Sequence, residues 1–134
     1  MVCGDSAGQF AELMQGSSMP IEVLTADTGT AATRKLLRSV MMKGLAALLI
    51  EAMRAGRAAG EGDWLWKNMV SQLTIADEAL MTRLVQGSKT HAWRRLHEME
   101  AAETLLGELE IDPVMTRSTV TSLRRLLNEE LPDL

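Results

Sequence analysis

Apolar residues recur at three- and four-residue steps through the first half of the chain. The positions are Leu36, Leu37, Val40, Met41, Leu45, Leu48, Leu49 and Met53. This period predicts an α-helix. Asp27 or Thr28 offers a candidate N-cap, and Gly60-Glu61-Gly62 is the first strong stop signal. We therefore expect one helix about 45 Å long, at roughly 1.5 Å per residue, that crosses the centre of its domain.

The helical pattern continues almost to the end of the chain. Asp63 and Asp77 each stand near the start of an apolar-periodic segment, and Asp112 places a capping carboxylate before Pro113. We expect these further helices at 63–73, from about 77, at 89–109 and from 113 to Pro132. The prediction is a mainly α protein whose residues 28–134 form an all-helical domain.

The first 27 residues follow a different pattern. Two short β-prone runs, at 1–3 and 21–24, flank a helix-like segment at 7–14, and glycine, serine and proline lie in the gaps. A strand, helix and strand of this size cannot form a domain because the strands need partners. We expect residues 1–27 to be a β-α-β remnant of a larger domain.

Composition and charge exclude several classes of protein. The chain has 134 residues, 46% of them hydrophobic, which is enough to bury a core. Its net charge of -4 argues against a nucleic-acid partner, and its apolar runs are too short to span a membrane. The sequence has one cysteine, which cannot form an internal disulfide, and we therefore expect a cytoplasmic protein. One cysteine and two histidines are too few for a zinc site, so we expect no metal.

A polar stripe interrupts the long helix. Lys35, Ser39 and Lys43 are four residues apart and Arg38 lies beside them, so an amine, a hydroxyl and a guanidinium share one face. A lysine near other cations can serve in proton transfer, and an arginine can bind a carboxylate or phosphate. The alternative is that these are solvated charges on an exposed face, which is the commoner case on helices.

His97 is a second candidate for chemistry, because a histidine can titrate near neutral pH and donate to a substrate. In its charged helix it can equally be a solvated surface residue. The segment from Gly4 to Gly8 matches neither a dinucleotide fingerprint nor a phosphate-binding P-loop. Neither pattern occurs elsewhere in the chain.

Two sequence elements mark these helices. One is KxxxSxxxKG, from Lys35 to Gly44, and the other is RRxxEM, from Arg94 to Met99. With them, residues 21–127 resemble the C-terminal helical domain of the 6-phosphogluconate dehydrogenase and β-hydroxyacid dehydrogenase superfamily. The chain is most similar to its phosphogluconate dehydrogenase-like branch, described as an NAD-binding C-terminal domain. The implied fold is a helical domain with a long central helix, preceded by the end of a Rossmann domain.

The resemblance also implies roles for particular residues. In that superfamily a lysine of the central helix is the general acid and base during hydride transfer, and the matching residue is Lys35, which follows Gly29 by six positions. Arg38 and Ser39 stand where the superfamily pattern carries an asparagine, sometimes preceded by histidine. These two would hold the substrate. His97 lies near the position of a cleft-facing pair and would also contact substrate.

The implied function is that of a substrate-side and dimerisation domain. The whole enzyme would be an NAD(P)-dependent oxidoreductase that acts on a small hydroxy acid or a related alcohol. We expect NAD or NADP to bind the full-length enzyme and not this chain alone, which we expect to be inactive by itself. Under this interpretation, the chain is either a truncated piece of the enzyme or a natural short protein. The alternative function is a non-enzymatic helical module for self-association, and a homodimer is expected under both.

Overall fold

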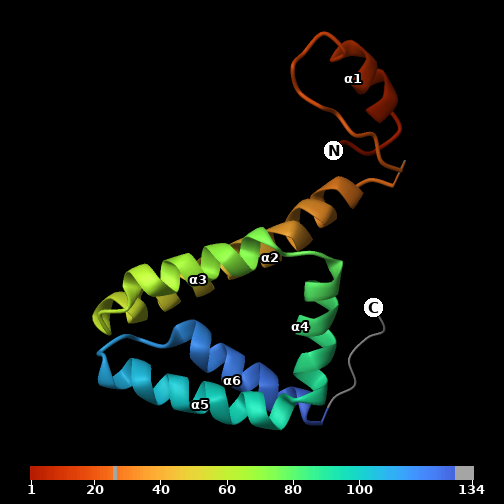
Figure 1. The fold of residues 1–134 in the computed structure, drawn as a ribbon. Helices are drawn as coiled ribbons and strands as arrows, with labels where there is room; N and C mark the ends of the chain where they lie inside the picture. Colours follow the sequence, from red (N-terminus) through yellow and green to blue (C-terminus); the bar gives the residue numbers. More distant parts are fainter. Residues whose placement is uncertain (26, 129–134) are drawn as a thin grey trace. The chain divides into compact units, whose positions relative to one another are not determined.

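The computed structural model describes residues 1–25 and 27–128, and within them the chain is mainly helical (Figure 1). The helices are α1 (Ala7–Leu13), α2 (Thr30–Ala58), α3 (Gly62–Thr74), α4 (Glu78–Thr90), α5 (Ala92–Glu108) and α6 (Val114–Leu126). The expected long helix is therefore confirmed as α2. The predicted last helix ends earlier within this part of the chain, and residues 129–132 of that prediction lie outside the described residues.

The chain divides into two compact units, Met1–Leu45 and Ala46–Leu134. The division falls inside α2, whereas the sequence-based division at residues 27 and 28 follows a change of secondary structure. That domain assignment stays a prediction. Each unit is described below by itself.

In the first unit, the β-α-β remnant is not formed as strands. Val2 and Val23 make one isolated parallel bridge, in which the Val2 amide donates to the Glu22 carbonyl at 2.8 Å and the Leu24 amide donates to the Val2 carbonyl at 2.9 Å. The strands predicted at 1–3 and 21–24 are therefore wrong for the described residues. The physical reason is that two short extended segments without a third partner do not extend their ladder.

A side-chain cap explains where α4 begins, and the starts of α3 and α5 differ from those predicted. The Asp77 carboxylate accepts a hydrogen bond from the Leu80 amide at 2.8 Å, as expected of an N-cap. Asp63 lies in the first turn of α3 rather than at its cap, which is Glu61. The helix predicted at 89–109 begins later, because α4 extends to Thr90 and His91 separates it from α5.

The same C-terminal turn follows both α2 and α5. After α2, the Gly60 amide donates to the Arg57 carbonyl at 3.1 Å and the Glu61 amide donates to the Gly56 carbonyl at 2.7 Å. This is a Schellman motif, with Gly60 in the left-handed region at φ 77°. Glycine adopts that conformation without a steric penalty.

After α5, a glutamate occupies the left-handed position. The Glu110 amide donates to the Gly107 carbonyl at 3.1 Å, and the Ile111 amide donates to the Leu106 carbonyl at 2.9 Å, with Glu110 at φ 58°. A side chain in this region is strained relative to glycine. The two backbone hydrogen bonds close the turn, and of the residues that the second bond joins, Leu106 is buried and Ile111 is half-buried.

Helices α5 and α6 form a hairpin that holds the core of the second unit (Figure 1). Leu96 of α5 is buried against Val120 and Leu123 of α6, with Met99 and Leu126 packed around them. Exposed ion pairs join the outer faces of the hairpin, from Arg117 to Glu103 at 3.1 Å and from Arg124 to Glu100 at 2.8 Å. Such exposed pairs contribute little, so apolar contact holds the hairpin together.

A single carboxylate ties α2 to the start of α6. Glu51 is buried, with 7% of its surface exposed, and its Oε2 accepts from the Met115 amide at 2.7 Å. Its Oε1 accepts from the Thr116 amide at 2.8 Å and from the Thr116 hydroxyl at 2.7 Å. The expected cap, Asp112, makes no side-chain hydrogen bond to these amides, and Pro113 occupies the N-cap position. Glu51 therefore caps α6 from another helix.

The cap keeps Glu51 ionised. Burial by itself raises the pKa of a carboxyl group, but the Thr116 hydroxyl, the Met115 and Thr116 amides and the nearby Arg117 charge all favour the anion. Their combined effect is larger, and the pKa of Glu51 lies below its usual value of 4.5. The charge therefore stabilises the folded state fully above about pH 4.5, and this stabilisation is lost as the pH falls through the lower, folded-state pKa.

Substitution of Glu51 by glutamine tests the cap. The variant loses the charge, and its amide group faces a backbone donor, so we expect the free energy of unfolding at neutral pH to fall by about 2–4 kcal/mol. Below about pH 4.5 the deficit should narrow, because Glu51 of the unfolded wild-type chain is then protonated, and the folded protein takes up the same proton at its lower pKa. Urea titrations across this pH range measure both effects. Glu108→Gln, on the exposed surface of α5, is the control and should change little; a deficit that does not vary with pH contradicts the assignment.

Substitution of Glu110 by glycine tests the strained turn. Glycine removes the steric penalty of the left-handed conformation but gains freedom in the unfolded chain, so we expect a net stabilisation of about 0.5–1 kcal/mol. Thermal unfolding of the two proteins measures it. Gly60→Ala makes the reverse change in the matching turn and should destabilise the protein. Loss of stability in Glu110→Gly contradicts the description of this turn.

Candidate functional site

The residues predicted to act on substrate lie in two different units. Lys35, Arg38 and Ser39 belong to α2 in the first unit, where the helical spacing places them on one face. Lys35 and Arg38 are exposed and Ser39 is half-buried. Among residues 1–25 and 27–128, neither cation has an ion-pair partner, whereas the adjacent Arg34 lies 3.6 Å from Glu22. The structure thus groups these three candidates on an open helix surface.

His97 lies on α5 in the second unit. Its ring meets the indole of Trp93 edge to face, with the ring centroids 4.4 Å apart, and its Nδ1 is 3.3 Å from Oε2 of Glu100. The neighbouring Glu98 pairs with Arg94, as the four-residue spacing predicts. All of these contacts are on the protein surface. They give His97 an aromatic neighbour and a carboxylate neighbour on the same helix.

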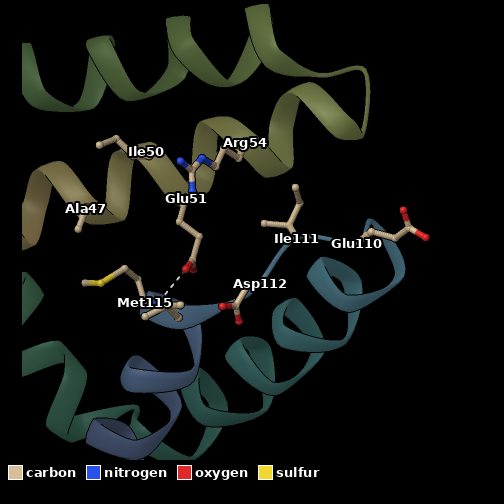
Figure 2. A pocket seen from close by; sticks show the side chains of 9 residues that line it. Ala47, Ile50, Glu51, Arg54, Glu110, Ile111, Asp112 and Met115 are labelled. Carbon is tan, nitrogen blue, oxygen red and sulfur yellow. Dashed lines mark hydrogen bonds between the residues drawn. The ribbon is translucent and has the colours of Figure 1, made fainter.

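A cavity of about 460 Å³ lies elsewhere in the second unit, beside the Glu51 cap. Figure 2 shows that its walls come from the second half of α2, the connection between α5 and α6, and the start of α6. The lining residues are Ala47, Ile50, Glu51, Arg54, Glu110, Ile111, Asp112, Val114 and Met115. The cavity therefore forms where Glu51 holds the start of α6 against α2.

Charges of both signs line this cavity. In Figure 2 the Glu51 carboxylate lies between the guanidinium of Arg54, on α2, and the carboxylate of Asp112, in the connection. The Glu110 carboxylate is directed to the outside. Within the part of the chain that the structure describes, Arg54 has no ion-pair partner, and Asp112 has only Arg117, at 3.8 Å. The cavity thus contains a cation and an anion that do not pair with each other.

Sequence reasoning missed Glu51 and Arg54. The signal for Glu51 was present, since it is the one acid in the apolar stretch from Leu45 to Met53. A charged residue at such a position is seldom buried unless it is paired or hydrogen-bonded. Its partners, Met115 and Thr116, lie more than sixty positions away, so the spacing along α2 could not reveal them.

The described residues contain no group of three or more histidine, cysteine or acidic side chains that could hold a metal ion. None of the helices in the described ranges is long and apolar enough to cross a bilayer.

Relatives in two organisms are similar to almost the whole of this chain. A protein in the 7S RNA 5′ region of Methanothermus fervidus, described as an uncharacterized 28.5 kDa protein, is 27% identical over 126 residues, which cover 94% of this chain and 50% of that protein. The chain thus spans about half the length of this relative. The crystal structure of a conserved hypothetical protein from Sinorhizobium meliloti 1021 is 26% identical, with a TM-score of 0.45, over 91% of this chain and 41% of the other.

A protein family described as "Domain of unknown function (DUF1932)" matches residues 57–126, from the last turn of α2 to the end of α6. The matched segment is more than half of the 134 residues. The chain therefore belongs to the DUF1932 family.

Proposed function

We propose that this chain is the helical, substrate-side domain of an NAD(P)-dependent oxidoreductase that acts on a small hydroxy acid or a related alcohol. The observation that carries the proposal is the KxxxSxxxKG element on a long helix, which resembles the central helix of the 6-phosphogluconate dehydrogenase and β-hydroxyacid dehydrogenase superfamily. Its lysine, Lys35, is solvent-accessible on α2, so a substrate can reach it.

In the proposed reaction, Lys35 in its neutral amine form would accept the proton of the substrate hydroxyl as the carbinol carbon is oxidised, and a bound dinucleotide would supply the hydride acceptor. The protonated lysine then donates in the reverse direction. Arg38 would bind the substrate carboxylate, because a guanidinium matches the geometry of that group, and Ser39 would donate a hydrogen bond from the next turn. His97 is a further candidate for substrate contact.

The dinucleotide would come from a separate domain. This chain contains neither a G-x-G-x-x-G fingerprint nor a P-loop, and it spans half the length of the Methanothermus relative. We propose that NAD or NADP binds a Rossmann domain in the complete enzyme, that this chain alone binds neither, and that the enzyme works in the cytoplasm without a nucleic-acid or membrane partner. The cofactor supplies the hydride acceptor, and the residues of this chain hold the substrate and move the proton.

Substitution of Lys35 by methionine in the polypeptide that carries both domains tests this function. We expect kcat for oxidation of short hydroxy acids to fall about 100-fold or more, because the proton acceptor is removed. The measurement is NADH or NADPH formation with a panel of 2- and 3-hydroxy acids. Lys43→Met, an exposed lysine two turns further along the same helix, is the matched control and should retain activity.

Two results would contradict the proposal. One is equal activity in the Lys35→Met and Lys43→Met proteins. The other is micromolar binding of NAD or NADP to this chain alone in calorimetry, which would place the dinucleotide site within these 134 residues.

A second candidate function is self-association without catalysis, and the surface of α2 favours it. In the first unit, Leu36, Leu37, Val40 and Met41 are all exposed, and Val40 has 74% of its surface open to solvent. A run of large apolar side chains of this kind is typical of a protein interface. We propose that α2 pairs with the same helix of a second copy to form a homodimer, whether or not the complete protein is an enzyme.

Substitution of Val40 by glutamate tests the dimer. A carboxylate at the centre of an apolar interface is buried without a partner, so we expect the molar mass from light scattering to fall from that of a dimer to that of a monomer. Lys43→Glu, one turn away and already polar, should leave the mass unchanged. A wild-type monomer at high concentration would rule out the self-association function.

A further inference from the structure

We propose that the cavity beside the Glu51 cap binds a small zwitterionic amino acid with an aliphatic side chain. Lys35, Arg38 and Ser39 do not line this cavity, and the proposal does not depend on hydride transfer. Three features of the cavity carry it: a free acceptor position for an ammonium group, an unpaired guanidinium for a carboxylate, and apolar side chains in the rest of the lining.

The ammonium group would lie between Glu51 and Asp112. A carboxylate offers about four acceptor positions, and the α6 cap uses three of those on Glu51, two on Oε1 and one on Oε2. Oε2 therefore keeps one position. The Asp112 side chain is 75% exposed, and its nearest cation, Arg117, is 3.8 Å away, beyond hydrogen-bond distance. Together the two carboxylates can accept from an ammonium group without disturbing the cap.

The carboxylate of the ligand would bind Arg54. This side chain lines the cavity from α2 and is exposed, and among the residues that the structure describes it has no ion-pair partner. A guanidinium binds a carboxylate through two parallel hydrogen bonds. Glu51 is the nearest acid along the helix, but its charge is already held by the start of α6. Arg54 is thus available to an anion that enters the cavity.

The remaining wall is aliphatic. Ile50 comes from α2, Ile111 from the connection and Met115 from α6. A volume of about 460 Å³ is at the lower end of the range for small-molecule sites, roughly 300–1,000 Å³. A short branched side chain such as that of leucine matches this wall.

The separation of charges selects a ligand that carries both signs. A simple carboxylate would be repelled by Asp112 and Glu51 and would bring no cation to them, whereas a simple amine would leave Arg54 without an anion. An amino acid satisfies both ends at once. We therefore expect a zwitterion to bind more tightly than either of its singly charged analogues.

Three ligands that share one aliphatic body test this on the intact chain. L-leucine carries both charges, 3-methylbutylamine carries only the ammonium, and 4-methylpentanoate carries only the carboxylate. Titration of each ligand, followed by amide chemical shifts, should show saturable binding of leucine with a Kd at least tenfold lower than that of either analogue. The shifts should centre on residues 47–54 and 110–115.

Two variants assign the charges, and a third is the control. Arg54→Met should raise the Kd of leucine at least tenfold, so that leucine no longer binds more tightly than the amine. Asp112→Asn should reduce the difference in Kd between leucine and the carboxylate. Arg57→Met alters the next exposed arginine of α2, which does not line this cavity, and should leave leucine binding unchanged. Arg54 and Asp112 are both exposed, and circular dichroism verifies that each variant keeps its helices.

The proposal is overturned if leucine shows no saturable binding, if 4-methylpentanoate or 3-methylbutylamine binds as tightly as leucine, or if the Arg54→Met and Arg57→Met variants bind leucine with the same affinity. Because this experiment uses no dinucleotide and no hydroxy acid, its failure leaves the proposed oxidoreductase function untouched. Failure of the Lys35 experiment likewise leaves this site standing.

Discussion

The second unit depends on one buried charge. Glu51 takes the place of a local cap at the start of α6, and no apolar residue could do so, because the amides of Met115 and Thr116 need an acceptor. The charge in turn needs those donors, since an unpaired buried carboxylate is strongly unfavourable. The Glu51 carboxylate and the first amides of α6 therefore satisfy each other's hydrogen bonds. The contact fixes the register between the end of α2 and the α5–α6 hairpin and opens the cavity beside it.

Buried apolar contact in the described residues is concentrated in one place. Leu96, Val120 and Leu123 form the core cluster of the hairpin, while many large apolar side chains of α2, α3 and α4 remain exposed. The three tryptophans, Trp64, Trp66 and Trp93, are among the exposed residues. A polypeptide of this composition can cover more of its apolar surface than this. The proposed pairing of α2 with a second copy would cover part of this exposed apolar surface.

Local signals predicted most of the helices, and long-range contacts account for most of the errors. Asp77 caps α4 through an amide three residues away, which sequence spacing can specify. Asp112 was assigned the same role for α6, but Glu51, which no local rule connects with that helix, holds the amides. The predicted strands failed for a related reason, because a strand depends on partners elsewhere in the chain. Lys35, Arg38, Ser39 and His97 were found from sequence and remain predictions, whereas the cavity required the folded chain.

The position of Glu51 also shows where a functional fragment should be cut. The DUF1932 family match begins at residue 57, after Glu51, although it includes all of α6. A fragment trimmed to the matched residues would keep the hairpin but would separate α6 from its acceptor. The compact unit that begins at Ala46 contains both. The unit recognised by sequence similarity is thus shorter than the compact unit that contains both partners of the cap, and the missing portion, residues 46–56, is about three turns of helix.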